Sequence, residues 1–494
     1  MTHCYKLGGY NIAIDVASGS IHSVDEAAYD VISIYKSAPK EGIGAFLKGK
    51  YRRLNDGDVE GLFAEIDELI SQGKLFTVDE FDKTAARCEK PPLKALCLNV
   101  SHCCNMVCYY CFAGRGGYGD SGGLMSVETG KRAIDFLIGN SGGIKNLDVD
   151  FFGGEPLLNW GAVKEIVKYA RKIERETDKV FRFTLTTNGL LIDDDVIGFT
   201  NAEMSNVVLS LDGRPETNDA YRKLPGGTKE RSYASSKERR PASAWAPTQA
   251  LTGSYNAVAP KIRKLVEARG EREYYIRGTF TRDNPDFTLD ILHMADLGFT
   301  KLSIEPVVAA PGSDYGLAMD DLPWINRQYE TLAEEMRRRR TEGKGFTFYH
   351  FMLDLTGGPC IHKRIAGCGA GAGYMAVTPG GELYPCHQFV GNKRFLLGDV
   401  WRGVVNRGLR GEFINLGLHS RGECGDCWAR YYCSGGCAAN AYMWSGDIRG
   451  LYPPGCEMFK KRIECAIMLK ISELSPVYPP LWPGTSPGSG GGAP

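Results

Sequence analysis

The chain has 494 residues, and its 59 Lys and Arg residues balance its 59 Asp and Glu residues. This length allows two or three domains with a substantial core, and the balanced charge gives no reason to expect a nucleic-acid or membrane-surface partner. No apolar run of about 18 residues occurs and the first thirty residues lack the pattern of a signal peptide, so we expect a cytoplasmic protein without a transmembrane helix.

The sixteen cysteines are unusual for such a protein, because disulfides are rare in a reducing compartment. Four of them lie between 103 and 111 and nine between 360 and 465, whereas residues 112–359 contain none. Clustered thiols in a reducing compartment usually bind metal or perform redox chemistry. The distribution predicts two metal-binding regions on either side of a cysteine-free scaffold.

Residues 1–90 are predicted to form a small N-terminal module. The stretch "YKLGGYNIAIDVASGSIHSVD" indicates a β-hairpin with its turn at Ser18–Ser20. Helical patterns follow at 25–38 and 58–76. A hairpin with helices is typical of a winged-helix-like unit, and a simple N-terminal extension is the alternative.

Residues 91–345 alternate between strand and helix patterns. Six runs rich in β-branched and aromatic residues predict strands, at 94–100, 146–152, 180–188, 206–212, 273–280 and 300–307. Helical patterns separate them, including 126–140, where Ser126 is placed to cap the helix. This alternation predicts an α/β fold with a parallel sheet, either open or curled into a partial barrel. In barrels the chemistry lies at the C-terminal strand ends, which here carry the first cysteines, "GGEP", "TNG" and "DG".

Two segments interrupt these patterns. Residues 224–253 are rich in Ser, Ala, Pro and basic residues and show no period, so we expect a flexible insertion. The Pro- and Gly-rich tail at 476–494 is expected to be disordered. The remaining stretch, 346–475, is predicted to be a separate cysteine-rich domain.

Cys104, Cys108 and Cys111 have the spacing C-x3-C-x2-C. Zinc sites of the finger type usually combine two C-x2-C pairs into four ligands, whereas this loop offers three thiolates. Such a loop can bind three irons of a 4Fe–4S cluster and leave the fourth iron open. Cys103 is an alternative ligand, although adjacent cysteines point in different directions.

The spacing, with Tyr110 as the aromatic residue before the third cysteine, resembles the signature of the radical S-adenosylmethionine (SAM) superfamily. The motif "GGEP", with Gly153, Gly154 and Glu155, is similar to the family's second motif, which receives the amino group of SAM. Glycines let a ligand approach the backbone, and a carboxylate or carbonyl accepts from an ammonium.

The resemblance implies further site residues and a fold. Ser210 and Arg277 stand where relatives bind the SAM carboxylate, and Asn188 is a candidate for the ribose. The implied fold is a partial (β/α)6 TIM-like barrel of the radical SAM type. The implied chemistry is one-electron cleavage of SAM into methionine and a 5′-deoxyadenosyl radical, which abstracts hydrogen from a substrate C–H bond.

The second cysteine region resembles the SPASM pattern of seven cysteines, which holds two auxiliary 4Fe–4S clusters in relatives. The resemblance assigns Cys368, Cys386 and Cys437 to the first auxiliary cluster, and Cys424, Cys427, Cys433 and Cys456 to the second. Cys360 either closes the first cluster or leaves an open iron there, and spacing does not decide between these. A pair of structural zinc sites is the competing interpretation.

The order of module, barrel and SPASM domain resembles peptide maturases whose N-terminal RiPP recognition element binds a leader peptide as an added β-strand. Within that group, sequence stretches such as "LNVSHCCNMVCYYCFAG" and "CWARYYCSGGCAANAY" are most similar to the maturases of SCIFF ("six cysteines in forty-five") precursor peptides. The resemblance implies a sactionine-type thioether bond from a peptide cysteine to an α-carbon, typically of threonine. It also implies a cysteine-rich precursor as partner and an electron donor such as ferredoxin or flavodoxin.

Three alternatives stay open. Two lie within the superfamily, namely a carbon–carbon cross-link in a peptide and formylglycine formation on a sulfatase. The third is a non-catalytic, zinc-stapled adaptor that binds peptides.

Overall fold

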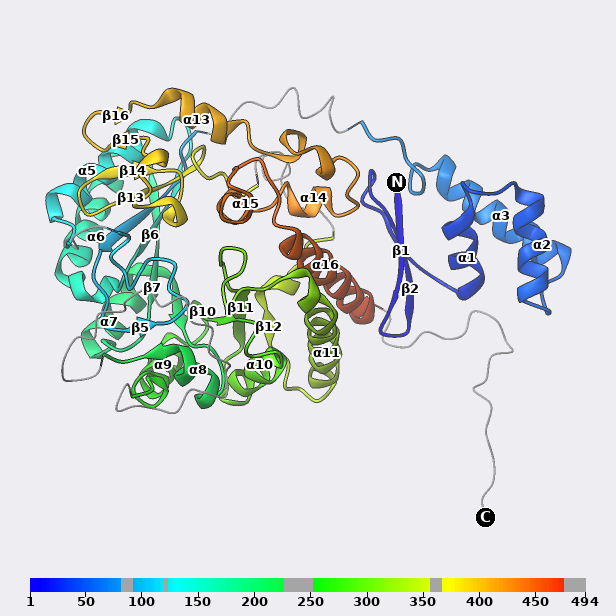
Figure 1. Cartoon of the computed structure of the whole chain (residues 1–494), viewed down its shortest axis with the longest axis horizontal. Coiled ribbons are helices and arrows are strands. Elements are labelled where there is room, and N and C mark those ends of the chain that lie inside the picture. Colours follow the sequence, from blue (N-terminus) through cyan, green and yellow to red (C-terminus); the bar gives the residue numbers. More distant parts are fainter. Residues whose placement is uncertain (81–91, 120–122, 226–251, 356–366, 475–494) are drawn as a thin grey trace, which may run out of the picture.

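The computed structural model describes residues 1–80, 92–119, 123–225, 252–355 and 367–474 (Figure 1). Most of the predicted insertion at 224–253, the predicted tail and Cys360 lie outside these described residues. No helix within the described ranges is both long enough and apolar enough to span a lipid bilayer.

The N-terminal module consists of a three-stranded antiparallel sheet and three helices. Its elements are β1 (Thr2–Leu7), β2 (Tyr10–Asp15), β3 (Ile21–Val24), α1 (Glu26–Ile34), α2 (Lys40–Lys50) and α3 (Asp56–Ser71). The predicted turn at Ser18–Ser20 joins β2 to β3. The single hairpin was an incomplete prediction, because Gly8 and Gly9 form a second turn with φ values of +60° and +85°. Glycine adopts such values without strain, so this pair divides one apolar run into two strands.

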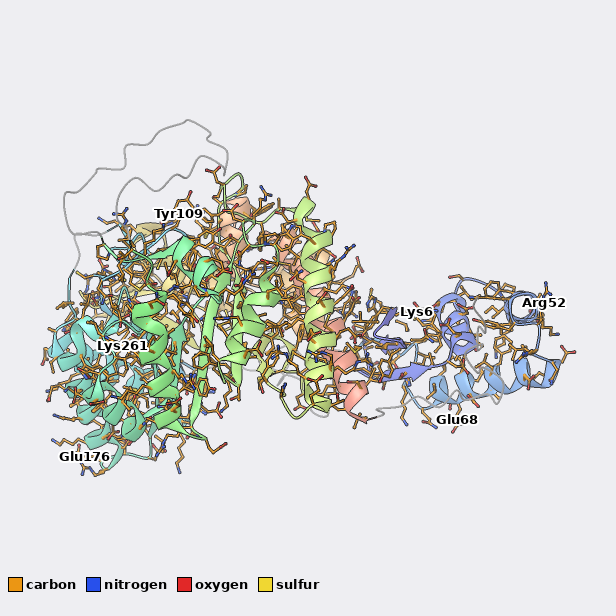
Figure 2. All side chains as sticks on the ribbon, turned by 90° about the horizontal axis from the view of Figure 1, so that it is seen from below. Lys6, Arg52, Glu68, Tyr109, Glu176 and Lys261 are labelled. Carbon is orange, nitrogen blue, oxygen red and sulfur yellow. The ribbon has the colours of Figure 1, made fainter. Side chains whose placement is uncertain are left out.

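The module contacts the rest of the chain through β1 and the C-terminal helix α16 (Pro453–Leu474). The His3 ring stacks on Trp428 with centroids 3.9 Å apart, and the Tyr5 hydroxyl donates to the Glu464 carbonyl at 3.0 Å. Figure 2 shows Arg52 at the end of the module that lies farthest from the main body. The module is therefore anchored at one edge and projects from the body.

All six strands predicted for the central region are present and parallel. They are β4 (Ala95–Ser101), β6 (Asn146–Gly153), β7 (Val180–Thr187), β8 (Met204–Ser210), β10 (Glu273–Phe280) and β11 (Lys301–Pro306), and they lie in this order in the sheet. Their outward-facing side chains, such as Leu96, Val149 and Ile276, are fully buried under the helices. Apolar burial on that face of the sheet explains why the runs were recognisable.

Helices connect successive strands, as predicted for βα alternation, and surround the sheet in Figure 1. They are α5 (Val127–Asn140), α6 (Trp160–Glu174), α7 (Asp194–Glu203), α8 (Pro215–Tyr221), α9 (Tyr255–Arg269), α10 (Phe287–Asp296) and α11 (Leu322–Thr341). Ser126 caps α5 as predicted, since its side chain accepts from the backbone N–H of Thr129.

The sheet continues into the cysteine-rich region. Strand β13 (Tyr374–Val377) pairs in parallel with β4, and β14 (Glu382–Tyr384), β15 (Gly398–Asp399) and β16 (Gly403–Val404) follow as antiparallel neighbours. On the other side β12 (Thr347–Phe348) extends the sheet beyond β11. Among the described strands, β12 and β16 are the two ends of the order, so pairing does not close the sheet into a full barrel.

The remaining elements of the cysteine-rich region are short. Its helices are α13 (Arg407–Ile414), α14 (Arg430–Cys433) and α15 (Ala438–Ser445), before α16. Single 3-10 turns occur along the described chain, at Pro156–Asn159, Met319–Asp321, Tyr349–Phe351, His387–Phe389, Lys393–Phe395, Leu418–Ser420 and Gly422–Cys424.

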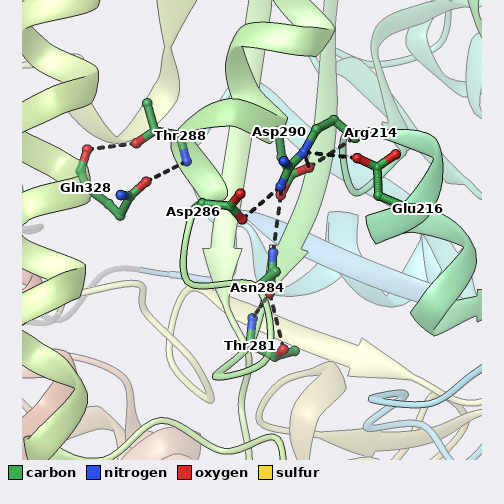
Figure 3. A network of polar contacts seen from close by, with 8 residues as sticks. All are labelled: Arg214, Glu216, Thr281, Asn284, Asp286, Thr288, Asp290 and Gln328. Atoms are coloured by element: carbon green, nitrogen blue, oxygen red, sulfur yellow. Dashed lines mark hydrogen bonds and ion pairs between the residues drawn. The ribbon is translucent and has the colours of Figure 1, made fainter. Parts of the chain in front are cut away.

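The loop after β8 is held by a polar network that Figure 3 shows in detail. Arg214 donates to the fully buried Asp290 at 2.8 Å and pairs with Asp286 at 2.8 Å, both at α10. A Cβ on Gly213 would lie 2.2 Å from that of Asp290, so only glycine fits there. These contacts fix the position of Asp212, directly before the glycine.

Candidate cofactor site

The three predicted cluster cysteines lie in one loop after β4. Strand β5 (Val107–Cys108) of this loop pairs antiparallel with β9 (Arg222–Lys223), which places Cys108 opposite Arg222. Burial, together with the charges of Glu155, Cys108 and Cys111, raises the pKa of Cys104 to about 12. The three thiols therefore lie close enough to interact electrostatically. Cys103 is exposed, and its backbone carbonyl accepts from the Glu155 N–H at 2.9 Å.

A series of hydrogen bonds between buried polar side chains supports the cysteine loop. The Tyr110 hydroxyl donates to Asp212 at 2.5 Å, and Asp212 also accepts from the Thr279 N–H at 3.1 Å. The guanidinium of Arg222, with 7% of the residue exposed, donates to the Tyr110 oxygen at 3.2 Å. Burial raises the pKa of Asp212 to about 6, although the charge of Arg222 opposes the rise. The predicted aromatic position is thus tied to two charged groups.

Arg222 was not predicted from the sequence, because an arginine after a short helix normally reads as a surface residue. Burial raises the pKa of the Cys108 thiol, and the Arg222 charge is the group that opposes this most. Its Nε is buried and has no hydrogen-bond partner among the described residues. A buried N–H donor on the residue opposite Cys108 fits an anionic iron–sulfur cluster, which accepts hydrogen bonds at sulfur.

The "GGEP" loop packs directly on the cysteine loop. A Cβ on Gly153 would lie 2.3 Å from the Ser101 carbonyl oxygen, and one on Gly154 would lie 2.2 Å from the Cys103 carbonyl oxygen. Neither gap admits a side chain. The two glycines therefore allow the ends of β4 and β6 to meet, which is a packing reason for the motif besides its predicted contact with SAM.

Glu155 is fully buried and faces protein donors. Its carboxylate accepts from the N–H of Leu157 at 3.0 Å, the Thr187 hydroxyl at 2.8 Å and the N–H of Asn188 at 2.8 Å. The Glu155 carboxylate thus stabilises the turn after β7 through these hydrogen bonds. The backbone carbonyls of this motif are therefore better placed than the Glu155 side chain to contact the SAM ammonium. That contact remains a prediction.

Asn188, the predicted ribose contact, touches the cysteine loop. Its Nδ2 donates to Asn105 Oδ1 at 2.7 Å and lies 3.8 Å from Cys104 Sγ. The structure therefore places this residue beside the first thiol. Its predicted role in binding the ribose stays a prediction.

Ser210 and Arg277, the predicted carboxylate contacts, are direct cross-strand partners on β8 and β10. Residues paired in this way point to the same face of the sheet, here the face away from the helices. Arg277 is half-exposed, and its Nη2 lies 3.5 Å from Glu305, which also pairs with His350 at 3.2 Å. Although burial alone would raise it, His350 and Arg277 hold the pKa of Glu305 below its usual value. The sequence had given no sign that Arg277 would have a carboxylate partner.

Two cysteines of the second region, Cys386 and Cys433, are each influenced by thiols of one predicted group. Burial and the charges of Cys437 and Cys368 raise the pKa of Cys386. Burial and the charges of Cys456, Cys424 and Cys427 raise the pKa of Cys433 to about 12. The thiols whose charges raise the pKa of Cys386 and of Cys433 thus belong to the ligand set predicted for each.

Cys433 and Cys437 are close in sequence but join different groups. Between them, Ser434, Gly435 and Gly436 have φ values of +58°, +88° and +73°. Three left-handed residues in succession reverse the chain, which two glycines make feasible. This turn explains how adjacent ligands in the motif serve separate sites.

Within the part of the chain that the structure describes, no three side chains of metal-binding type come together closely enough to hold a single ion. A four-iron cluster makes a different demand, because each thiolate binds its own iron. The residues present fit such clusters through their three and four grouped thiols and the unpartnered Arg222 donor.

Aromatic rings lie between the first loop and the first auxiliary group. Phe112 follows Cys111, Phe152 precedes the glycine motif, and His387 follows Cys386. The His387 ring lies 5.6 Å from that of Phe112 and 5.1 Å from that of Phe152. The rings that follow Cys111 and Cys386 in the chain are therefore neighbours in the fold.

Residues 98–238, which include this loop and the strands around it, match the model of the radical SAM superfamily. The chain contains a radical SAM domain. A radical SAM domain implies SAM and a SAM-binding 4Fe–4S cluster as cofactors.

Several matched relatives are named as maturation or biosynthesis proteins. The mycofactocin maturase MftC of Mycolicibacterium smegmatis is 26% identical over 72% of this chain and 82% of its own length. The antilisterial bacteriocin subtilosin biosynthesis protein AlbA of Bacillus subtilis is 25% identical over 63% of this chain and 58% of its own length. The chain spans less than half the length of the first curated relatives it matches.

The solved structure of anSMEcpe with bound AdoMet and the Kp18Cys peptide has a similar fold. The TM-score is 0.59 and the identity 20%, and the alignment covers 78% of this chain and all of the other. The radical SAM α/β fold with its parallel sheet is thereby confirmed. The winged-helix and SPASM assignments remain predictions.

Proposed function

We propose that this chain is a radical SAM maturase that forms thioether cross-links in a cysteine-rich ribosomal peptide. The proposal is supported by the electrostatic influence that ten cysteines have on one another within three sets, of three, three and four thiols. One group lies in the radical SAM domain, and the other two supply auxiliary clusters. The maturases among the relatives support a peptide as substrate.

In this proposal Cys104, Cys108 and Cys111 hold the cluster that binds SAM, whose reductive cleavage supplies a 5′-deoxyadenosyl radical. The loops with Gly154 and Asn188 bring backbone and amide groups beside it. Ser210 and Arg277 lie side by side on the open face of the sheet, where they would orient the SAM carboxylate.

The balance of the reaction requires an electron acceptor. The peptide loses one hydrogen atom from an α-carbon to deoxyadenosine and one proton from a cysteine thiol, and the new C–S bond releases one electron. An auxiliary cluster takes that electron. In this proposal the neighbouring rings of Phe112, Phe152 and His387 lie between the SAM-binding cluster and that auxiliary cluster. A small electron-transfer protein such as ferredoxin or flavodoxin would supply the first electron.

The N-terminal module is the proposed leader-binding site. Its strand β3 is an edge of the three-stranded sheet, while β1 at the other edge faces α16. An extended peptide can add to the edge strand of a sheet by backbone hydrogen bonds. We therefore place the leader along Ile21–Val24.

The test is to incubate reconstituted protein with SAM, a reductant and a leader-bearing cysteine-rich peptide. We expect 5′-deoxyadenosine and a peptide lighter by two hydrogens per link, with one thiol fewer open to alkylation. The same mass loss with every thiol still alkylated would indicate a carbon–carbon cross-link instead. An aldehyde at a former cysteine would indicate formylglycine formation, and stoichiometric zinc without iron would indicate the adaptor.

A further inference from the structure

Arg421 is a buried arginine that neither the motif nor the proposed function uses. The residue is 6% exposed, and its guanidinium donates to the carbonyls of Gly435 and Ile448, the latter at 2.9 Å. Its own carbonyl accepts from the Cys424 N–H at 3.0 Å. The side chain thus holds together three separate stretches of the cysteine-rich region.

The guanidinium lies between the two auxiliary cysteine groups. A Cβ placed on Gly436 would be 3.8 Å from Arg421 Nη1 and 3.8 Å from Cys433 Sγ, which belongs to the second group. Arg421 and Cys368, of the first group, line the same small cavity. The positive charge also opposes the rise in thiol pKa at Cys424 and Cys437, one member of each group.

The charge of Arg421 lacks an ordinary counter-ion. Among the described residues no carboxylate forms an ion pair with it, and its Nε is buried without a hydrogen-bond partner. Arg430, a buried arginine nine residues later, is instead paired with Asp79 at 2.5 Å. A buried unpaired cation is costly unless an anion compensates it, and thiols of both groups lie within the electrostatic reach of Arg421.

We propose that Arg421 is a positioning residue shared by both auxiliary clusters, and that its charge makes both clusters easier to reduce. This inference rests on the proposed function, because it requires that the two groups hold iron–sulfur clusters. Reduction adds negative charge to a cluster, so a fixed positive charge and N–H donors beside the sulfurs raise its potential. One residue between two clusters would shift both in the same direction.

The experiment uses the full chain with Cys104, Cys108 and Cys111 replaced by Ala, so that only auxiliary clusters contribute to the spectra. Midpoint potentials are measured by redox titration followed by EPR for Arg421→Gln, Arg421→Lys and the parent. We expect Arg421→Gln to lower both potentials by about 59 mV, a tenfold change for one electron, and Arg421→Lys to stay nearer the parent. Equal potentials in the Gln and Lys variants, or a shift of one cluster alone, would overturn the inference.

Arg410→Gln is the matched control. Arg410 lies in the same region and donates to the Gly371 carbonyl at 3.3 Å, and burial alone lowers its pKa. It should leave both potentials unchanged, and a shift equal to that of Arg421→Gln would refute a specific role.

If Arg421→Gln does not assemble its auxiliary clusters, the iron content of the Gln and Lys variants is compared instead of their potentials. Loading of the Lys variant but not the Gln variant supports the charge, whereas failure of both shows that only the shape of the arginine matters and overturns it. A parent protein without auxiliary iron would refute the proposed function itself, which is a distinct outcome.

Discussion

The first cysteine loop and the cysteine-rich region place thiols together by different means. In the first, three cysteines within eight positions are held by backbone pairing of β5 with β9 and by the close approach of Gly153 and Gly154. In the second, thiols from residues 368 to 456 converge through short helices and a left-handed turn. Local spacing therefore determines the first site, whereas tertiary packing determines the second.

Both regions nevertheless contain a buried arginine with an unpartnered Nε among the described residues. Arg222 is opposite Cys108 on a neighbouring strand, and Arg421 is hydrogen-bonded to two carbonyls between the auxiliary groups. The common element is positive charge beside thiolates, although the scaffolds differ. The comparison predicts that changes in the two regions will have separable effects.

The largest effect is expected from Cys104→Ala, Cys108→Ala and Cys111→Ala together. Without these thiolates the SAM-binding cluster has no ligands, so formation of 5′-deoxyadenosine should fall to the level without enzyme. Product is measured by chromatography. The auxiliary clusters should remain, and SAM cleavage at the parent rate would contradict the assignment.

Cys427→Ala together with Cys433→Ala should separate the two regions in the opposite direction. The first loop is untouched, so SAM cleavage should continue, while the cross-linked peptide should be lost because the first auxiliary cluster can no longer pass the surplus electron on to the second. Both products are measured in one reaction. Complete loss of SAM cleavage in a folded protein would show that the two regions are not independent.

Arg222→Gln should weaken the first site by about 10- to 100-fold in activity, the usual cost of removing a group that supports a metal ligand. The loss of charge beside Cys108 and of the bond to Tyr110 is the physical reason. Iron content and 5′-deoxyadenosine formation are the measurements. Lys223→Gln on the same strand is the control, and an equal loss there would point to the strand pairing instead.

Gly154→Ala should destabilise the loop by about 1–3 kcal/mol, since the added methyl overlaps the Cys103 carbonyl. Thermal unfolding of the apoprotein gives the difference. Gly139→Ala in α5, where a Cβ meets nothing within 4 Å, should be neutral or stabilising. Equal stability of the two variants would mean that the loop adapts to the methyl group.

The smallest effect is a change in pH dependence on Asp212→Asn. The pKa of Asp212 is raised to about 6 in the folded chain, so the native state binds a proton that the unfolded state releases between about pH 4 and 6. The free energy of unfolding therefore declines as pH rises through this window, by at most about 1.4 kcal/mol per pH unit. The variant should lack this component in urea titrations at several pH values, and an unchanged slope would exclude Asp212 as its source.

The central strands were predictable because each is a short apolar run with one face under helices. The pairing of β13 with β4 was not, since about 270 residues separate them and no local pattern encodes the contact. The turn at Gly8 and Gly9 was missed because the residues around it continue the apolar alternation.

Motif cysteines were predictable from spacing, but their supporting charges were not. Arg222 and Arg421 stand in ordinary polar surroundings in the sequence and become buried only when distant segments pack over them. A buried arginine is rare, and chain order alone does not reveal it.

Iron, sulfide and zinc analysis of three reconstituted proteins tests the separation of the cysteine groups most directly. The parent should contain three 4Fe–4S clusters, the first-loop variant should lack one, and the Cys427→Ala, Cys433→Ala variant should lack a different one, distinguishable by EPR. Stoichiometric zinc in place of iron, or loss of all iron in either variant, would contradict the account.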